Sequence, residues 1–209
     1  MAVLRVWGRR SVANVQKVMW CLGELGIEYV HEDCNGTLTG ARDNEYVAQK
    51  GAGVVPLIDD DGFVLWEGNA VARYLARKHG RNGLWPEDPQ AQADAERWMD
   101  YQLSTARVHL HPLMRETPDA REAAFHARML AEVMKVPERA LEARDYLAGD
   151  AFTVADIPLG IVAYRWEVLD IPRPPMPAIE AWLGRLRARP AFRAHVIPPE
   201  GALTPLRAG

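Results

Sequence analysis

The hydrophobic positions of this chain follow one pattern up to about residue 80 and another beyond it. In the first part, short apolar runs typical of strands alternate with apolar residues spaced three and four apart, as in amphipathic helices. Residues 3–7 predict a strand, residues 15–25 predict a helix that Gly26 ends, and residues 27–32 predict a second strand. We therefore expect a βαβ unit with a parallel pair of strands.

The next segment predicts a hairpin of strands and then a helix. Residues 37–50 are mostly polar, with one short helix expected near Glu45. Predicted strands over residues 55–58 and 63–66 are joined by Asp-Asp-Asp-Gly, which is a strong hairpin signal. A helix over residues 67–79 follows. The predicted order is βαβ-α-ββα, in which the hairpin adds an antiparallel strand.

Beyond residue 80 every periodic segment is helical. A stretch rich in glycine, asparagine and proline predicts a linker, and helices are expected over residues 95–106 and 120–146. Pro137 should kink or divide the second of these helices. Thr153 and Asp156 have the spacing of a capping box, in which the threonine hydroxyl accepts from an unpaired helix amide and the aspartate side chain reaches back. Two further apolar stripes predict helices, and their members are Ile157, Ile161, Tyr164 and Val168, then Ile179, Trp182, Leu183 and Leu186.

Charge and composition exclude several classes of protein. The 209 residues carry a net charge of only −3, without the basic excess of a nucleic-acid-binding protein. No apolar run approaches the roughly 20 residues of a membrane span, and residues 1–7 do not have the pattern of a signal peptide. Two cysteines are too few for a disulfide framework. We therefore expect a cytoplasmic protein with reduced thiols and with no nucleic-acid or membrane partner.

The cysteines and histidines do not predict redox or metal chemistry. Cys21 falls on the apolar face of the first helix, as an inert core thiol would, and Cys34 stands alone in a polar loop. The absence of a Cys-x-x-Cys pair argues against a disulfide oxidoreductase. His109 and His111 are two residues apart and face different sides of a helix. We find no metal-ligand spacing, so no metal is expected.

The segment from Val54 to Asn69 is the most informative part of the chain. A strand, a tight turn, a second strand and a helix start follow one another there, and Glu67 meets the helix N-terminus. That layout brings backbone amides and a helix dipole together around a small polar ligand. Pro56 at the strand start indicates either a special turn, such as one with a cis peptide, or an ordinary trans proline.

Four segments resemble the cytosolic glutathione transferases, and in particular bacterial members with serine or asparagine in the active-site loop. Their sequences are SVANVQKVMWCLGELG (residues 11–26), VVPLI (54–58), WEGNAVARY (66–74) and LAGDAFTVADIPLG (147–160). The resemblance implies a thioredoxin-like α/β domain over residues 1–80 that binds glutathione. It also implies a linker over 81–89 and an all-helical domain over 90–209 for the co-substrate.

The same resemblance implies an activity, which is conjugation of the glutathione thiolate to a small hydrophobic electrophile in detoxification. Glutathione would be the co-substrate, and the protein would be a homodimer. A glutathione-dependent isomerase or dehalogenase remains an alternative, because it uses the same thiolate. A third alternative is a non-catalytic binding or regulatory protein that has kept the fold, which Val54 and Gly68 favour because they depart from the family pattern.

Ionising the glutathione thiol requires a hydrogen-bond donor. A free thiol has a pKa of about 8.5, and lowering it by two units takes about 2.7 kcal/mol. One bond to a charged group contributes roughly 1.5–3 kcal/mol, and a helix N-terminus adds roughly 0.3–1 kcal/mol. Ser11 and Asn14 are the two candidate catalytic donors, although helix capping would explain either residue equally well.

The resemblance also implies contacts to the tripeptide. The main chain of Val55, before Pro56, would bind the cysteinyl unit. Glu67 would bind the γ-glutamyl amine, and the N–H of Gly68 would meet the γ-glutamyl carboxylate without the usual hydroxyl group. Since Val54 replaces a residue that is often basic, the glycyl carboxylate would fall to one of two other polar residues, Lys50 or Gln49.

The co-substrate pocket is expected between the two domains. Its candidate lining residues are Tyr101, Arg107, His109 and Trp166. Aromatic residues at helical spacing are just as well explained as core, so packing remains the alternative for each of them.

Overall fold

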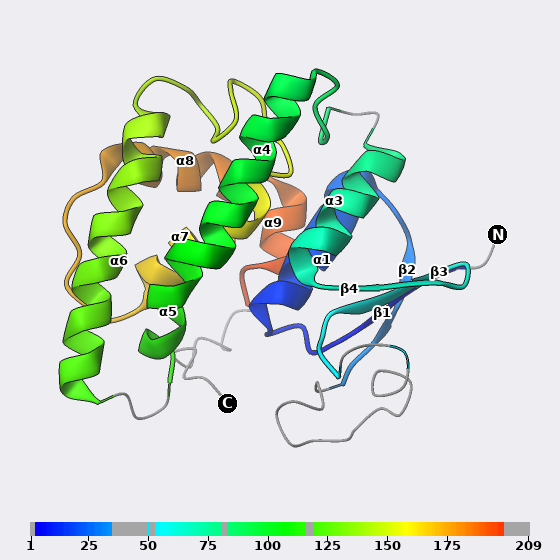
Figure 1. Cartoon of the computed structure of the whole chain (residues 1–209), viewed down its shortest axis with the longest axis horizontal. Coiled ribbons are helices and arrows are strands. Elements are labelled where there is room, and N and C mark those ends of the chain that lie inside the picture. Colours follow the sequence, from blue (N-terminus) through cyan, green and yellow to red (C-terminus); the bar gives the residue numbers. More distant parts are fainter. Residues whose placement is uncertain (1–2, 35–49, 51–52, 81–82, 116–118, 199–209) are drawn as a thin grey trace.

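The computed structural model describes residues 3–34, 50, 53–80, 83–115 and 119–198. A four-stranded sheet forms one end of the molecule and a group of helices forms the other (Figure 1). The predicted helix near Glu45 lies outside the described residues. Among those residues, no helix is long and apolar enough to cross a membrane.

The sheet has the predicted mixed topology. Its strands are β1 (Leu4–Trp7), β2 (Tyr29–Glu32), β3 (Leu57–Asp60) and β4 (Phe63–Trp66), in the order β2-β1-β3-β4. β1 pairs parallel with β2 and antiparallel with β3, and β3 and β4 form the hairpin. The third strand begins two residues later than predicted, because Val55 and Pro56 precede the ladder.

Two helices cover the face of the sheet that carries Leu4, Val6 and Ile58. They are α1 (Ala13–Leu25) and α3 (Gly68–His79), which pack against each other. Gly26 ends α1 in the left-handed conformation, as predicted. The opposite face of the sheet buries a smaller cluster of Trp7, Leu57 and Cys34. Cys34 is therefore buried, and its prediction as a residue isolated in a polar loop is wrong.

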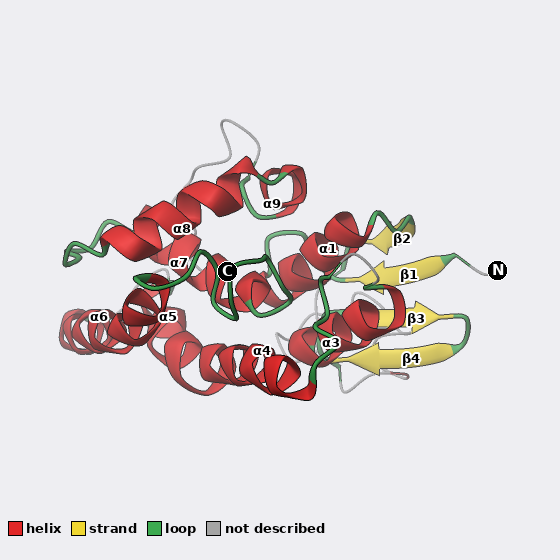
Figure 2. Ribbon diagram, turned by 90° about the horizontal axis from the view of Figure 1, so that it is seen from above, coloured by secondary structure: helices red, strands yellow, loops and turns green. Residues whose placement is uncertain are grey.

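The helical part contains a central helix surrounded by others (Figure 2). Its elements are α4 (Pro89–Tyr101), a π-helical turn η2 (Gln102–Ala106), α5 (Arg107–Leu113), α6 (Ala120–Leu141), α7 (Asp156–Val168), α8 (Pro177–Ala188) and α9 (Pro190–His195). The helix predicted over residues 95–106 is longer at both ends, because α4, η2 and α5 follow one another without a break. α7 is buried on every side from Asp156 to Trp166, which the predicted apolar stripe did not anticipate.

α6 continues through Pro137, so the prediction that this proline might divide the helix is wrong. A proline removes the N–H that would bond to the carbonyl four residues earlier, and here that carbonyl belongs to Val133. The hydroxyl of Tyr101, on α4, donates to the Val133 oxygen at 2.6 Å instead. A hydrogen bond between two helices thus replaces the one that the proline removes within its own helix.

The capping box at the start of α7 forms as predicted and extends further than the sequence suggests. One carboxylate oxygen of Asp156 accepts from the N–H of Thr153 at 2.9 Å, and the Thr153 hydroxyl accepts from the N–H of Ala155 at 3.3 Å. The other oxygen accepts from the N–H of Leu147 and from Nε1 of Trp182, each at 3.0 Å. Asp156 is fully buried, so these donors have no access to water.

Replacing Asp156 with alanine should therefore destabilise the fold strongly. The variant leaves three buried N–H donors without acceptors, and we expect a loss of about 3–5 kcal/mol in the free energy of unfolding. Denaturant unfolding monitored by tryptophan fluorescence measures this loss. Asp150→Ala is the matched control, since Asp150 is exposed in the same loop; equal stability of the two variants would contradict the role given to Asp156.

Candidate active site

The loop between β1 and α1 is held against the segment before β3 by a glycine. Gly8 has a φ of +139°, a conformation that side chains rarely adopt. A Cβ atom at this position would lie 2.5 Å from Cγ2 of Val15 and 3.0 Å from Cβ of Val55. Only glycine allows the two segments to approach so closely, and the approach brings the predicted donor loop beside Val55.

Neither candidate donor caps the first helix. The residue before α1 is Val12, whose side chain makes no capping bond, and the first turn contains no acidic residue. Ser11 is exposed in the preceding turn, and Asn14 is half-buried within the first turn. Capping therefore does not explain these two residues, and the positive end of the α1 dipole is not offset by a carboxylate of its own first turn.

The start of α3 packs directly on the first turn of α1. A Cβ atom at Gly68 would lie 2.9 Å from the backbone oxygen of Asn14 and 3.2 Å from its Cβ. A serine or threonine would collide at this position, so the glycine is a consequence of close packing. The contact also brings Asn14 to the helix start at which Glu67 stands.

Glu67 stands in an unusual backbone conformation at the N-terminus of α3. Its φ is +71° and its ψ is 107°, although it is not a glycine. Conformations of this kind cost about 1–3 kcal/mol and cluster at functional sites. Its side chain is exposed, and no described residue donates a hydrogen bond to the carboxylate. The result is an anion with no partner among the described residues, beside the open amides of a helix start, which suits a ligand with both an amine and a carboxylate.

The predicted main-chain contact also lies at this place. The peptide bond between Val55 and Pro56 is cis. Val55 is half-buried, and neither its N–H nor its carbonyl bonds to any residue of the described part of the chain. Lys50 is exposed, whereas Gln49 lies outside the described residues.

A buried polar junction joins α1, α3 and the π-helical turn. Nζ of Lys17 donates to Oδ1 of Asn69 and to Oε1 of Gln102, each at 2.8 Å. Asn69 donates in turn to the backbone oxygen of Met99 at 2.8 Å. Burial lowers the pKa of Lys17 from 10.5 to about 7, and the positive charge of Arg107 adds to the effect. The junction links the two parts of the chain directly behind the Glu67 helix start.

The predicted co-substrate residues are mostly occupied by other contacts. The hydroxyl of Tyr101 is bonded to the backbone of α6, and Nδ1 of His109 lies 3.1 Å from Nδ1 of His126. Trp166 is buried within α7, whereas Arg107 is exposed. Tyr101, His109 and Trp166 are thus engaged within the fold, and the exposed Arg107 is the member that remains available for a co-substrate.

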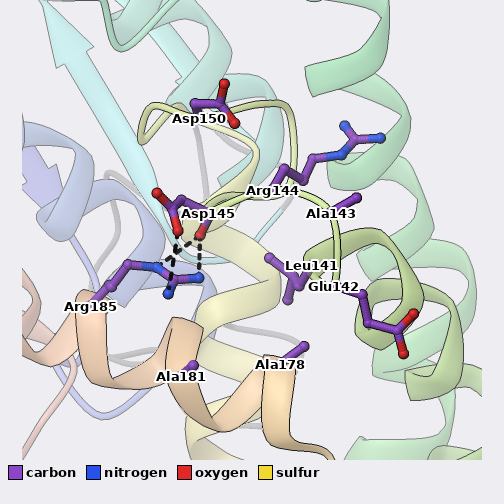
Figure 3. A pocket seen from close by; sticks show the side chains of 9 residues that line it. All are labelled: Leu141, Glu142, Ala143, Arg144, Asp145, Asp150, Ala178, Ala181 and Arg185. Carbon is purple, nitrogen blue, oxygen red and sulfur yellow. Dashed lines mark hydrogen bonds and ion pairs between the residues drawn. The ribbon is translucent and has the colours of Figure 1, made fainter.

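A separate hollow of about 310 Å³ lies between the loop after α6 and helix α8 (Figure 3). Arg185 donates across it to the backbone oxygen of Asp145 at 2.6 Å. None of the residues that line this hollow belongs to the predicted site. Within the described ranges, no group of three or more histidine, cysteine or acidic side chains is placed to hold a metal ion.

Two models of one known family match this chain. Residues 2–77 match the glutathione S-transferase N-terminal domain, and residues 103–190 match the corresponding C-terminal domain. The chain is 32% identical to Escherichia coli glutathione S-transferase GstB, with 94% of this chain and 99% of the relative covered. The chain belongs to the glutathione S-transferase family.

Further relatives and a solved structure agree with this membership. Glutathione S-transferase 3 of Zea mays is 30% identical, with 95% and 97% of the two chains covered. The fold superimposes with a TM-score of 0.87 on the theta class glutathione S-transferase of Xanthomonas axonopodis pv. citri, whose structure has glutathione bound. That chain is 36% identical, and the match covers 95% of the present chain and 99% of the other.

Three residues near this transferase site were missed by the sequence analysis. The sequence feature that could have pointed to Gly8 is its position directly after a predicted strand. Lys17 and Gln16 lie in the same helical run as Val15 and Val18, and a polar pair among apolar positions looks solvent-exposed when only the period is counted. In the fold, residues 15–22 of α1 are all buried, because α1 packs against α3, α7 and α9.

Replacing Lys17 with methionine should change how the stability of the transferase depends on pH. Lys17 is protonated up to about pH 10 in the unfolded chain but loses its proton near pH 7 in the fold. The unfolded state therefore binds more protons between pH 7 and pH 10. The contribution of Lys17 to the free energy of unfolding therefore increases by about 1 kcal/mol per pH unit as the pH rises from 7 to 10. The same contribution is lost as the pH falls back to 7.

Denaturant unfolding at pH 7, 8 and 9 tests this difference. Lys17→Met should lack the slope, whereas the control Lys135→Met, at an exposed position on α6, should keep it. Identical slopes in all three proteins would mean that Lys17 stays charged in the fold.

Proposed function

We propose that this protein conjugates the thiolate of glutathione to small hydrophobic electrophiles. The observation that carries the proposal is the unpaired carboxylate of Glu67 at the start of α3, packed beside Asn14 and the open first turn of α1. These groups complement the amine, the carboxylate and the thiol of one γ-glutamyl peptide. The structure of the Xanthomonas relative, which has glutathione bound, supports this ligand.

In this proposal each group has one task. Glu67 binds the γ-glutamyl ammonium, and the N–H of Gly68 at the start of α3 binds the γ-glutamyl carboxylate. The N–H and carbonyl of Val55, which bond to no described residue, bind the cysteinyl backbone. The exposed Lys50 binds the glycyl carboxylate. The sulfur then lies toward the first turn of α1. It forms a bond to the electrophilic carbon while that carbon releases its leaving group with the bonding electrons.

Asn14 is the better candidate for the thiol's donor. Its side chain starts beside Gly68, so it lies next to the groups that would bind the γ-glutamyl unit. The amide of an asparagine donates to sulfur much as a hydroxyl does. Ser11 remains the second candidate, in an exposed position one turn earlier.

The packing of Gly68 weakens the non-catalytic alternative. The missing hydroxyl at this position looked like a sign of a lost ligand. Close approach of Asn14 excludes a larger side chain there whether or not a ligand binds. The glutathione-dependent isomerase or dehalogenase alternative uses the same thiolate, and no separate feature of the described residues favours it.

We also propose that the protein is a cytoplasmic homodimer with a role in detoxification. β4 is the outer strand of the sheet, and Phe63 and Trp66 on it are 49% and 40% exposed. β4, α3 and α4 lie along the same side of the molecule (Figure 2). Leu103, in the π-helical turn that follows α4, is also 39% exposed. Large apolar side chains that are exposed at the outer strand and along α4 and its extension suit burial against a second copy.

Glutathione should stabilise the protein, and the Glu67→Gln variant should bind it more weakly. At 100 times the dissociation constant, glutathione should add about 2.7 kcal/mol to the free energy of unfolding. Loss of the ion pair should weaken binding about 10- to 100-fold. Calorimetric titration measures both proteins, with the exposed Glu28→Gln as the control. Absence of binding by the unaltered protein would refute the proposed function.

Comparison of Asn14→Ala with Ser11→Ala should identify the donor to the thiol. Removing the donor costs about 1.5–3 kcal/mol of thiolate stabilisation, so kcat/KM should fall about 10- to 100-fold at neutral pH. We expect this loss for Asn14→Ala and a smaller one for Ser11→Ala. Steady-state rates with a chromogenic aryl halide measure it, and Ser104→Ala, exposed on the π-helical turn, is the control. Unchanged rates in both variants would exclude the two residues as donors.

A further inference from the structure

Arg165 of α7 is the only arginine that is buried among the described residues. It is 6% exposed. One terminal nitrogen, Nη2, donates to the backbone oxygen of Ser11 at 2.7 Å and to Oε1 of Gln16 at 2.9 Å. The guanidinium therefore reaches from the helical domain to the turn just before α1 and to the second turn of that helix. Those are the two ends of the segment that carries both candidate donors.

Among the described residues, no carboxylate neutralises this buried charge. Arg165 forms no ion pair within the described part of the chain, and its partners are a backbone oxygen, an amide oxygen and, at 3.7 Å, the sulfur of Met114. Its Nε is buried without any hydrogen-bond partner. Burying a cation that is not paired is costly. A neutral side chain would brace the loop at a lower cost, so bracing alone does not account for the arginine.

The charge remains present at physiological pH. Burial lowers the pKa of Arg165 to about 10, and the titratable groups that interact with it include Tyr164 and Lys17. Tyr164 is neutral at pH 7. Lys17 has lost part of its charge at that pH, because its own pKa is about 7. Arg165 is thus a permanent and buried positive charge behind the open end of α1.

We propose that Arg165 is a positioning residue that fixes the Ser11 turn and, through its unneutralised charge, lowers the pKa of the glutathione thiol. The inference rests on the proposed function and adds to it a source of electrostatic activation from the helical domain. A cation near an ionising group favours its anionic form. Gln16 keeps the guanidinium in place without neutralising it, and donates at 3.4 Å to the backbone oxygen of Val196.

The pKa of the bound thiol tests the proposal, and it is measured from the ultraviolet absorbance of the thiolate in the glutathione complex. Arg165→Gln removes the charge but keeps a donor, and it should raise the thiol pKa by about one unit. Arg165→Lys keeps the charge, and its thiol pKa should stay within a few tenths of a unit of the original. The control is Arg139→Gln, at an exposed position on α6.

A second variant tests the charge without removing the arginine. Gln16→Glu places a carboxylate beside Nη2, which neutralises the guanidinium and leaves the contact to Ser11. It should also raise the thiol pKa, by about one unit. This variant tests the role of the Arg165 charge even if Arg165→Gln does not fold.

The outcomes separate this inference from the proposed function. If the unaltered protein does not bind glutathione, the proposed function fails and the inference fails with it. If glutathione binds but Gln16→Glu leaves the thiol pKa unchanged, Arg165 only braces the loop and the inference alone is overturned. Equal shifts in Arg165→Lys and Arg165→Gln would also overturn it, because geometry and not charge would then set the thiol pKa.

Discussion

The candidate site depends on the close contact between the first residue of α3 and the first turn of α1. Gly68 lies so near to Asn14 that a single additional carbon atom would collide with its backbone. Gly8 allows a second close contact, between the end of β1 and Val55, which a Cβ atom at this position would prevent. These two contacts between backbone and neighbour bring a helix start, a free strand edge and a donor loop to one place. Larger residues would separate them, because packed interiors do not yield by even one methyl group without cost.

The positive charges near this site are buried beneath it. Lys17 and Arg165 are both buried beside α1, and their hydrogen-bond partners within the described residues are all neutral. The carboxylate of Glu67, in contrast, points to solvent. A cation that is buried and unpaired costs free energy in the free protein. An anionic ligand that binds nearby recovers part of this cost, which is how a site becomes complementary to the ionised form of its substrate.

The helical domain contributes to the site mainly by holding residues of the α/β part in place through hydrogen bonds. Its connections to the α/β part include those of Gln102 in the π-helical turn, Arg165 of α7 and Val196 after α9. π-helical turns inside longer helices are often found at functional sites. Here the turn places the amide of Gln102 on Lys17. α7, buried on every side, holds Arg165 in place while the Asp156 network secures the start of the same helix.

The sequence by itself determined the order of elements, the hairpin, the capping box at Thr153 and Asp156, and the segments that meet at the site, because local periods and turn residues encode these directly. It also indicated Glu67, Val55 and Asn14 as candidates. Only the tertiary structure decided that Lys17 and Arg165 are buried, that Gly68 is required by Asn14, and that Pro137 lies within an unbroken helix. Each of these depends on a neighbour more than thirty residues away along the chain, and the periodicity of a single helix carries no information about what packs against its polar side.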